Sequence, residues 1–430
     1  MAHFSMKLQK QIFDLVDAGV ITPETAKAIE GYYRAKEGSS NRLLIIFGIL
    51  GAILVGLGII LIIAHNWDEF SIGLKTGIGL LPLLIGQAVC GYALFFRSDQ
   101  TALRESSATF TFFAIGATLS IMSQVYNIQG ELSSYLFTWM LLALPLIYVM
   151  RSSMTSLLYL AGITYYAVEK GYWTYDSSAP YYWLFILGVL PHYFMQIKKC
   201  PGSNFTVYHH WLLPISLIIS LGTFADKDPN WLFVAYVSLF GIFCGLGHSG
   251  MIAGDSLRQN SYKILGALGT VVVLLVLSFD WFWQELRTHS TYARQDGYGL
   301  EFYAAWLLTL IALALFVRNL RKNGFSVIHP VEPVFFVFAI TFLLGYVSPV
   351  SVVLVNLYIF IIGLMTTRLG ARLENLGILN YGLLVITALV LCRFFDSDLN
   401  FVVKGFLFLL VGFGFFGANY YLIKKRKSNA

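Results

Sequence analysis

The chain alternates long apolar stretches with short polar gaps from residue 43 to its end. A helix needs roughly 20 apolar residues to cross the about 30 Å hydrocarbon core of a bilayer, and most stretches are close to that length. Backbone groups within hydrocarbon have no water to bond, so such stretches predict helices. The sequence therefore predicts an all-α, polytopic membrane helix bundle of about 14 transmembrane helices, within the range 12 to 14. The fourteen stretches are residues 43–64, 72–96, 106–126, 134–150, 153–170, 180–197, 208–225, 230–247, 262–280, 300–317, 333–347, 349–366, 377–393 and 401–423.

The composition excludes an ordinary soluble fold. Hydrophobic residues make up 57% of the 430 residues and charged residues 12%, and a soluble chain carries about twice that charged fraction. The net charge of +6 lies on one face of the predicted bundle, which favours anionic lipid headgroups over nucleic acid as a partner. The four cysteines show no paired spacing, so no disulfide framework is expected.

Charged residues separate into two groups when the gaps are numbered alternately from the inside. The inner gaps and both termini hold 22 Lys and Arg against 10 Asp and Glu, and the outer gaps hold 7 against 13, which accounts for all 29 basic and 23 acidic residues. Basic loops stay on the cytosolic side of a membrane. We therefore expect both termini to lie in the cytosol.

Residues 1–41 are predicted to form a small cytosolic helical hairpin, and residues 42–430 the transmembrane domain. Thr22 and Pro23 supply an N-cap and a proline at the first helical position for the second helix of this hairpin. Similar acidic turns and aliphatic runs also suggest an internal repeat, in which residues 262–423 copy residues 43–197. Chance similarity among aliphatic runs is the alternative.

The first outer turn is the most polar short segment between two strong spans. It contains His65, Asn66, Trp67, Asp68 and Glu69, and Lys75 follows at the start of the next span. Acidic groups are costly within hydrocarbon unless they are paired or hydrated, so one interpretation is a substrate or cation site at the outer face. A solvated turn, with His and Trp at the headgroup level, is the alternative interpretation.

The third span carries a polar stripe. Gly116, Ser120 and Gln124 are spaced i, i+4 and i+8, so they share one face of a helix. Such a face either packs on another helix through hydrogen bonds or lines a hydrated cavity. In the second case, the stripe, which Asn127 nearly continues, and the first outer turn form one vestibule, with Tyr126, Gln129 and Glu131 at its mouth.

No sequence motif indicates a metal, a cofactor or a catalytic residue. Cys200, His209, His210, Cys244 and His248 fall on the predicted inner side, but they lack the close pair spacing of metal ligands. Phosphate-loop, nucleophile and zinc-protease motifs are absent from the sequence.

Three segments carry a resemblance to a known family. They are residues 64–68 with Lys75 and Leu80-Leu81-Pro82, residues 123–130 with Leu144-Pro145-Leu146 and Arg151, and residues 19–22 with Tyr32-Tyr33. Together they resemble a bacterial family of predicted inner-membrane proteins, domain of unknown function 2157, over about residues 5–155. The resemblance implies a protein of the bacterial cytoplasmic (inner) membrane. It implies no activity and supplies no catalytic residues.

Three functions are compatible with these features. The first is a transporter or translocator of a small molecule or lipid, because many spans with short loops carry polar, Gly and Pro features. The second is an integral-membrane enzyme that uses Asp68, Glu69 or Glu131 on a lipid-linked substrate. The third is a membrane scaffold or sensor whose hairpin 1–41 binds a cytosolic partner.

Overall fold

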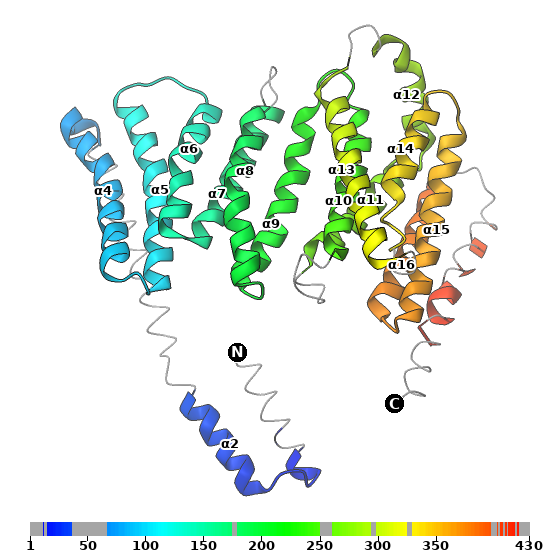
Figure 1. Ribbon diagram of the computed structural model, residues 1–430, viewed down its shortest axis with the longest axis horizontal. Helices are drawn as coiled ribbons and strands as arrows, with labels where there is room; N and C mark the ends of the chain where they lie inside the picture. Colours follow the sequence, from blue (N-terminus) through cyan, green and yellow to red (C-terminus); the bar gives the residue numbers. More distant parts are fainter. Residues whose placement is uncertain are drawn as a thin grey trace. The chain divides into compact units, whose positions relative to one another are not determined.

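The computed structural model describes residues 12, 15–36, 67–173, 179–249, 260–293, 298–324 and 329–396, and scattered positions between 402 and 420. Throughout these residues the chain is helical, and it divides into two compact units, Met1–Lys75 and Thr76–Ala430. The helices are α2 (Pro23–Lys36), η1 (Trp67–Glu69), α4 (Ile72–Phe96), α5 (Thr101–Val125), α6 (Leu132–Met150), α7 (Ser153–Tyr172), α8 (Pro180–Lys199), α9 (Asn204–Leu221), η2 (Gly222–Phe224), α10 (Trp231–His248), α11 (Ser261–Val276), α12 (Asp280–Ala293), α13 (Leu300–Asn323), α14 (Val334–Gly345), α15 (Val350–Arg372) and α16 (Leu376–Asp396) (Figure 1).

In the first unit, α2 begins where the sequence predicts. The backbone N–H of Thr25 donates to Thr22 Oγ1 at 3.2 Å, which satisfies one of the free amides at the start of the helix. The turn before it contains Gly19 at φ +69°, a left-handed conformation in which glycine is favoured. The boundary of the hairpin at residue 41 lies outside the described residues and stays a prediction.

The expected fourteen spans are wrong. Among the described residues, eight helices are long and apolar enough to cross a membrane, or nine if the bent pair α11 and α12 counts as one span. Two of the fourteen predicted stretches, 43–64 and most of 401–423, lie outside the described residues. The eight candidate spans indicate an integral, multi-pass membrane protein.

The remaining differences have physical causes. Helix α14 has 12 residues, and at 1.5 Å per residue it covers only about 18 Å of a hydrocarbon core of about 30 Å. Helices α7 and α8 are each 20 residues long, but they carry polar and charged side chains that lower their hydropathy. The predicted stretch 262–280 is interrupted, because α11 ends at Val276 and α12 continues at an angle of 71°.

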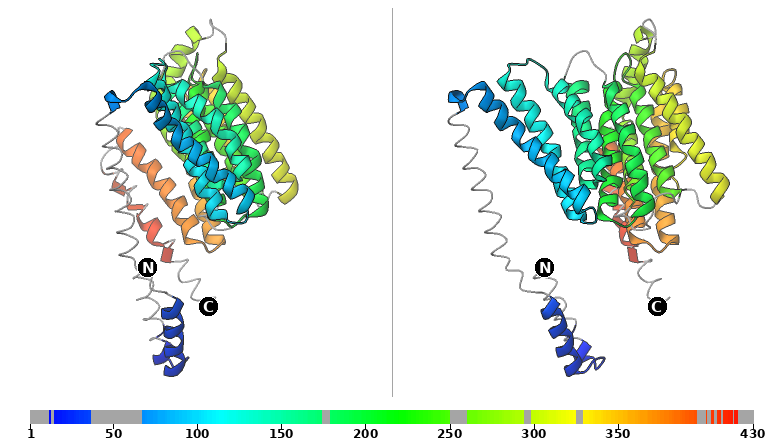
Figure 2. Two further views of the ribbon diagram at one scale, coloured as in Figure 1. Left: turned by 90° about the vertical axis from the view of Figure 1, so that its left-hand side faces the viewer. Right: turned by 60° about the vertical axis from the view of Figure 1, so that its left-hand side comes forward.

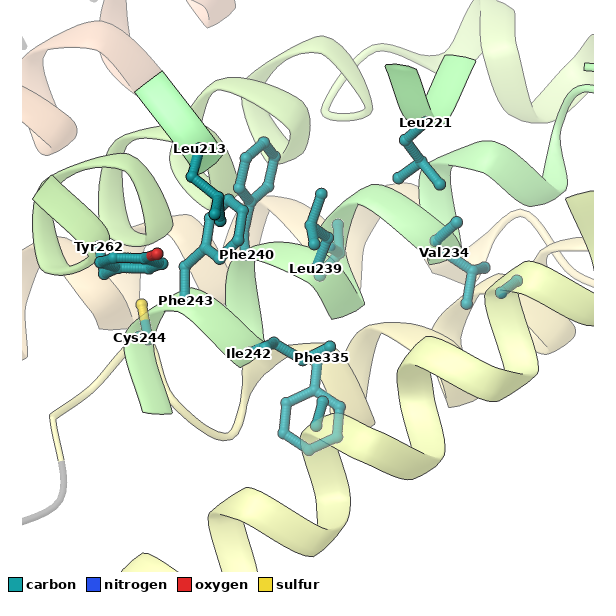
Figure 3. Packing of buried hydrophobic residues seen from close by; sticks show 14 of the residues in the cluster. Leu213, Leu221, Val234, Leu239, Phe240, Ile242, Phe243, Cys244, Tyr262 and Phe335 are labelled. Atoms are coloured by element: carbon teal, nitrogen blue, oxygen red, sulfur yellow. The ribbon is translucent and has the colours of Figure 1, made fainter. Parts of the chain in front are cut away.

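In the second unit, the helices lie side by side and consecutive ones run in opposite directions over most of the chain (Figures 1 and 2). Helix α10 is the most buried of the eight candidate spans. Its Phe243 and Cys244 lie near Tyr262 of α11, and its Ile242 lies near Phe335 of α14 (Figure 3). A Cβ atom on Gly266 of α11 would come within 2.8 Å of the backbone N of Cys244, so these two backbones are in contact.

Two histidines stack at the C-terminal end of α10. His248 Nδ1 lies 2.9 Å from Glu332 Oε1, and its ring stacks on His329 with centroids 5.1 Å apart. His329 lies in the connection between α13 and α14. Burial, assisted by the charges of His248 and Lys263, lowers the pKa of His329 to about 3.

The lowered pKa of His329 predicts that acid lowers the stability of the folded protein. Below its ordinary pKa of about 6.5, His329 takes up a proton in the unfolded state but not in the folded state, so acid favours unfolding. Between pH 7 and pH 5 we expect His329 to account for up to about 2 kcal/mol of lost stability. Thermal unfolding in detergent at the two pH values should show a smaller acid effect for His329→Gln. An equal loss in both proteins would contradict this prediction.

Candidate functional site in the helix bundle

Helices α7, α8 and α9 each present a polar stripe to the interior of the second unit. Side-chain caps start two of them: Ser152 accepts from Thr155 N, and Ser203 accepts from Thr206 N, both at 3.1 Å. The residues of each stripe recur at helical spacing and so share a face. We call the following set the polar seam: Ser153, Ser156 and Thr164 on α7, Tyr182, His192 and Gln196 on α8, and His209, Ser216 and Ser220 on α9.

The first part of the seam lies where α7 begins and α8 ends. The amide of Gln196 donates to Ser153 Oγ and lies 3.5 Å from His192 Nε2. His209 Nε2 lies 2.9 Å from Ser156 Oγ, and the rings of His192 and His209 are 6.0 Å apart. His192 is 3% exposed and His209 is fully buried. Two buried histidines therefore lie side by side, one with an amide partner and the other with a hydroxyl partner.

An acid from α5 joins this part of the seam. The Glu105 carboxylate accepts from Ser152 Oγ at 2.5 Å, from Ser153 N at 2.9 Å and from Met154 N at 3.0 Å. It therefore occupies the start of α7, where free backbone N–H groups favour a negative charge. Through Ser153 and Gln196, the carboxylate is connected to His192.

The second part of the seam lies further along the same three helices. Ser216 Oγ lies 2.6 Å from Thr164 Oγ1 and 2.7 Å from Tyr182 Oη. From Ser153 to Thr164 helix α7 rises roughly 17 Å, more than half of a hydrocarbon core of about 30 Å. The seam thus runs along the bundle, rather than around it.

An apolar layer separates the two parts. Leu160 and Ile163 of α7, Val189 of α8 and Leu213 of α9 occupy the intervening turns, and all four are buried. Pro191 and Pro214 lie within α8 and α9 next to this layer. Proline removes one helical hydrogen bond and bends a helix, so both flanking helices can change shape at this level.

Hydroxyl groups of neighbouring helices bond the carbonyls near these prolines. Pro214 cannot bond the carbonyl of His210 four residues earlier, and Ser261 Oγ of α11 donates to it instead. Tyr148 Oη of α6 donates to the Gly188 carbonyl, three residues before Pro191. The bond from Ser261 replaces the one that Pro214 cannot make, and such replacement bonds allow proline within a membrane helix.

A second hydrogen-bonded group lies beside the seam and includes a residue of α11. Tyr193 Oη lies 2.6 Å from His210 Nδ1 and 2.9 Å from Tyr262 Oη. All three rings of this group are buried, and His210 Nε2 is a buried atom without a hydrogen-bond partner. This group links α8, α9 and α11, and the Tyr193 ring lies 6.1 Å from the ring of the seam residue His209.

Tyr159 provides a contrast within α7. Its ring is fully buried, but its hydroxyl makes no hydrogen bond. A buried unpartnered polar group is unfavourable, so Tyr159→Phe should leave stability unchanged or raise it by about 1 kcal/mol. Tyr182→Phe removes a bonded hydroxyl and should lower stability by a similar amount. Unfolding temperatures in one detergent test the pair, and a larger loss for Tyr159→Phe would contradict the assignment.

The residues predicted for the outer vestibule fall in both units, and their grouping stays a prediction. His65 and Asn66 lie outside the described residues. Trp67, Asp68 and Glu69 form η1 in the first unit, where Lys75 Nζ lies 5.6 Å from the centre of the Trp67 ring. The other members, Ser120, Gln124, Tyr126, Asn127, Gln129 and Glu131, belong to the second unit.

In the second unit, the predicted stripe on α5 divides. Gly116 is buried against Trp139, which a Cβ atom there would approach to 2.6 Å, whereas Ser120 and Gln124 are exposed. The end of α5 is polar: Tyr126 Oη lies 3.0 Å from Thr76 Oγ1, and Asn127 takes a left-handed φ of 50°. Gln129 and Glu131 are exposed, and Glu131 lies 3.7 Å from Lys170 Nζ.

The sequence analysis missed the polar seam. Consecutive histidines at 209 and 210 in an apolar stretch, and the i, i+4 pair His192 and Gln196, were the available signals. Among the residues that the structure describes, no group of three or more His, Cys, Asp or Glu side chains is arranged to hold a metal ion.

Comparison with known proteins agrees with the resemblance seen in the sequence. A family model described as "Predicted membrane protein (DUF2157)" matches residues 13–156, about a third of the chain. Residues 13–156 belong to this family. The DUF2157 region reaches the start of α7 and includes Glu105, Ser153 and Ser156 of the site. No curated protein and no solved structure matches the chain.

Proposed function

We propose that this multi-pass membrane protein translocates a small molecule along the polar seam of α7, α8 and α9. The observation that carries the proposal is the seam itself: two sets of buried, hydrogen-bonded polar side chains along three adjacent helices. Polar and ionisable groups are costly within a membrane, and those that persist there commonly mark substrate or ion pathways.

The apolar layer and the prolines support a mechanism with a moving barrier. Leu160, Ile163, Val189 and Leu213 separate the two polar parts. A polar molecule would pass this layer only when α7, α8 and α9 move apart, and Pro191 and Pro214 are the positions where α8 and α9 bend most easily. Transporters commonly place their sites at interrupted helices near the middle of the membrane.

We propose the bacterial cytoplasmic membrane as the location, with both termini in the cytosol. Arg97 and Arg104 lie at the connection α4–α5 and Arg151 at the connection α6–α7, whereas the connection α5–α6 carries Glu131. This distribution supports the orientation, because basic loops remain cytosolic. In this orientation α7 begins at the cytosolic face, and Ser120, Gln124 and Glu131 lie toward the outer end of α5. The polar end of α5 is then an entrance for the solute, and hairpin 1–41 a surface for a cytosolic partner.

A comparison of bacterial strains tests the proposal. We expect a strain lacking the protein to differ from its parent in the distribution of at least one small molecule between cells and medium. The wild-type protein should restore this distribution, and His209→Leu should not, because leucine cannot bond Ser156. Leu142→Ala is the matched control, since Leu142 is an exposed side chain of α6.

Membrane abundance of all variants should be equal. The proposal is contradicted if parent and deletion strains have the same solute distribution, or if His209→Leu restores it as well as Leu142→Ala does.

A further inference from the structure

The first part of the seam contains two basic nitrogens that face polar partners. His209 Nδ1 lies 2.8 Å from the carbonyl of Phe205, and because a carbonyl only accepts, this nitrogen carries the hydrogen. His209 Nε2 is then a lone pair that accepts the hydroxyl hydrogen of Ser156. His192 Nε2 faces the amide nitrogen of Gln196, which only donates, so it is also a lone pair.

The pair can hold one proton more easily than two. Their ring centres are 6.0 Å apart, and at this distance a charge on one ring strongly disfavours a charge on the other. Around the pair lie Tyr193 on α8, whose ring is 6.1 Å from His209, and His210 on α9 with Tyr262 on α11, both of which bond Tyr193. None of these groups supplies a negative charge at neutral pH.

Glu105 supplies the negative charge. It is close enough to His192 for an electrostatic interaction, and it is connected to that ring through Ser153 and Gln196. Glu105 is half-buried in the first turns of α5, whereas both histidines are buried. Burial therefore increases from the carboxylate of Glu105, which is partly accessible, to the rings of His192 and His209, which are buried.

We propose that these residues form a one-proton site: His192 and His209 share one proton, Glu105 is its counter-charge, and this proton is the ion coupled to transport. The inference rests on the proposed function for its role in transport, but proton binding is a property of the protein alone. On protonation, a lone pair at Nε2 of one ring forms the new N–H bond and the ring becomes an imidazolium. The proton returns to the aqueous phase by the same atoms.

The test observes protonation directly. Protein labelled with ¹⁵N-histidine is placed in lipid nanodiscs, and its spectrum is recorded from pH 8 to pH 4.5. We expect the rings of His192 and His209 together to take up one proton in a single step. In His192→Gln or His209→Gln the remaining ring should take up this proton, and the step should disappear only when both histidines are replaced. In Glu105→Gln, which keeps an acceptor oxygen, the step should require about tenfold more acid, a shift of about one pH unit. His329→Gln is the control and should leave the step unchanged.

Each contrary outcome overturns the inference. The site is excluded if both rings stay neutral throughout the range, if both become charged together, or if Glu105→Gln titrates like wild type. The spectra need no solute, so they are independent of the strain comparison. If the variant that lacks both histidines loses the protonation step but still restores the solute distribution, the proton is not coupled to transport. If the wild-type protein shows the step but parent and deletion strains have the same solute distribution, the proposed transport is rejected.

Discussion

Replacing Gly382 with valine should prevent α15 and α16 from packing. A Cβ atom at Gly382 would lie 2.5 Å from the backbone N of Thr367 and 2.8 Å from the carbonyl oxygen of Gly363, both on α15. These contacts are with backbone atoms, which cannot rotate away as a side chain can. The two helices must therefore separate, and we expect a loss of about 3 kcal/mol or more.

The yield of monodisperse protein in detergent and its unfolding temperature measure this effect. Gly91→Val on α4 is the matched control, because a Cβ atom there meets nothing within 4 Å. Gly91→Val should behave as wild type. If Gly382→Val unfolds at the same temperature as Gly91→Val, then α15 and α16 do not pack as the structure describes.

Replacing Glu105 with alanine should detach the start of α7 from α5. The substitution removes the acceptor of three hydrogen bonds, two of them from backbone N–H groups at the first turn of α7. Each donor left without a partner costs about 1 kcal/mol or more, so the total loss should be about 3 kcal/mol.

Glu105→Gln is the control for this prediction, because its amide keeps one acceptor oxygen and nearly the same shape. It should lose less than half as much stability as Glu105→Ala in the same unfolding measurement. Equal unfolding temperatures for Glu105→Ala and wild type would show that the carboxylate does not hold α7.

Helix positions could be predicted from apolar length, because hydrocarbon leaves few alternatives to a helix. The stretch 72–96 coincides with α4, and 134–150 differs from α6 by two residues at its start. The number of helices that cross the membrane was predicted less well. Length alone does not distinguish a helix that faces lipid from α7 or α8, whose polar stripes face other helices.

The candidate site could not be assembled from the sequence. Its bonds join residues far apart in the chain, such as Ser156 with His209, and these meet only when three helices pack. Gly116, Ser120 and Gln124 share a face by periodicity, yet only Gly116 is buried. Periodicity gives a shared face, but the neighbour that covers it depends on tertiary packing.

The accessibility of the seam to water tests the central claim most directly. Cysteine is placed at Ser156 or at Ser216 in a protein whose four native cysteines are replaced, and sealed vesicles of both orientations are treated with a membrane-impermeant maleimide. If the seam lines a translocation path, the two cysteines should react from opposite sides, while cysteine at the exposed α6 position Leu142 should react from neither. Unreactive cysteines at both seam positions, in both orientations, would contradict the account.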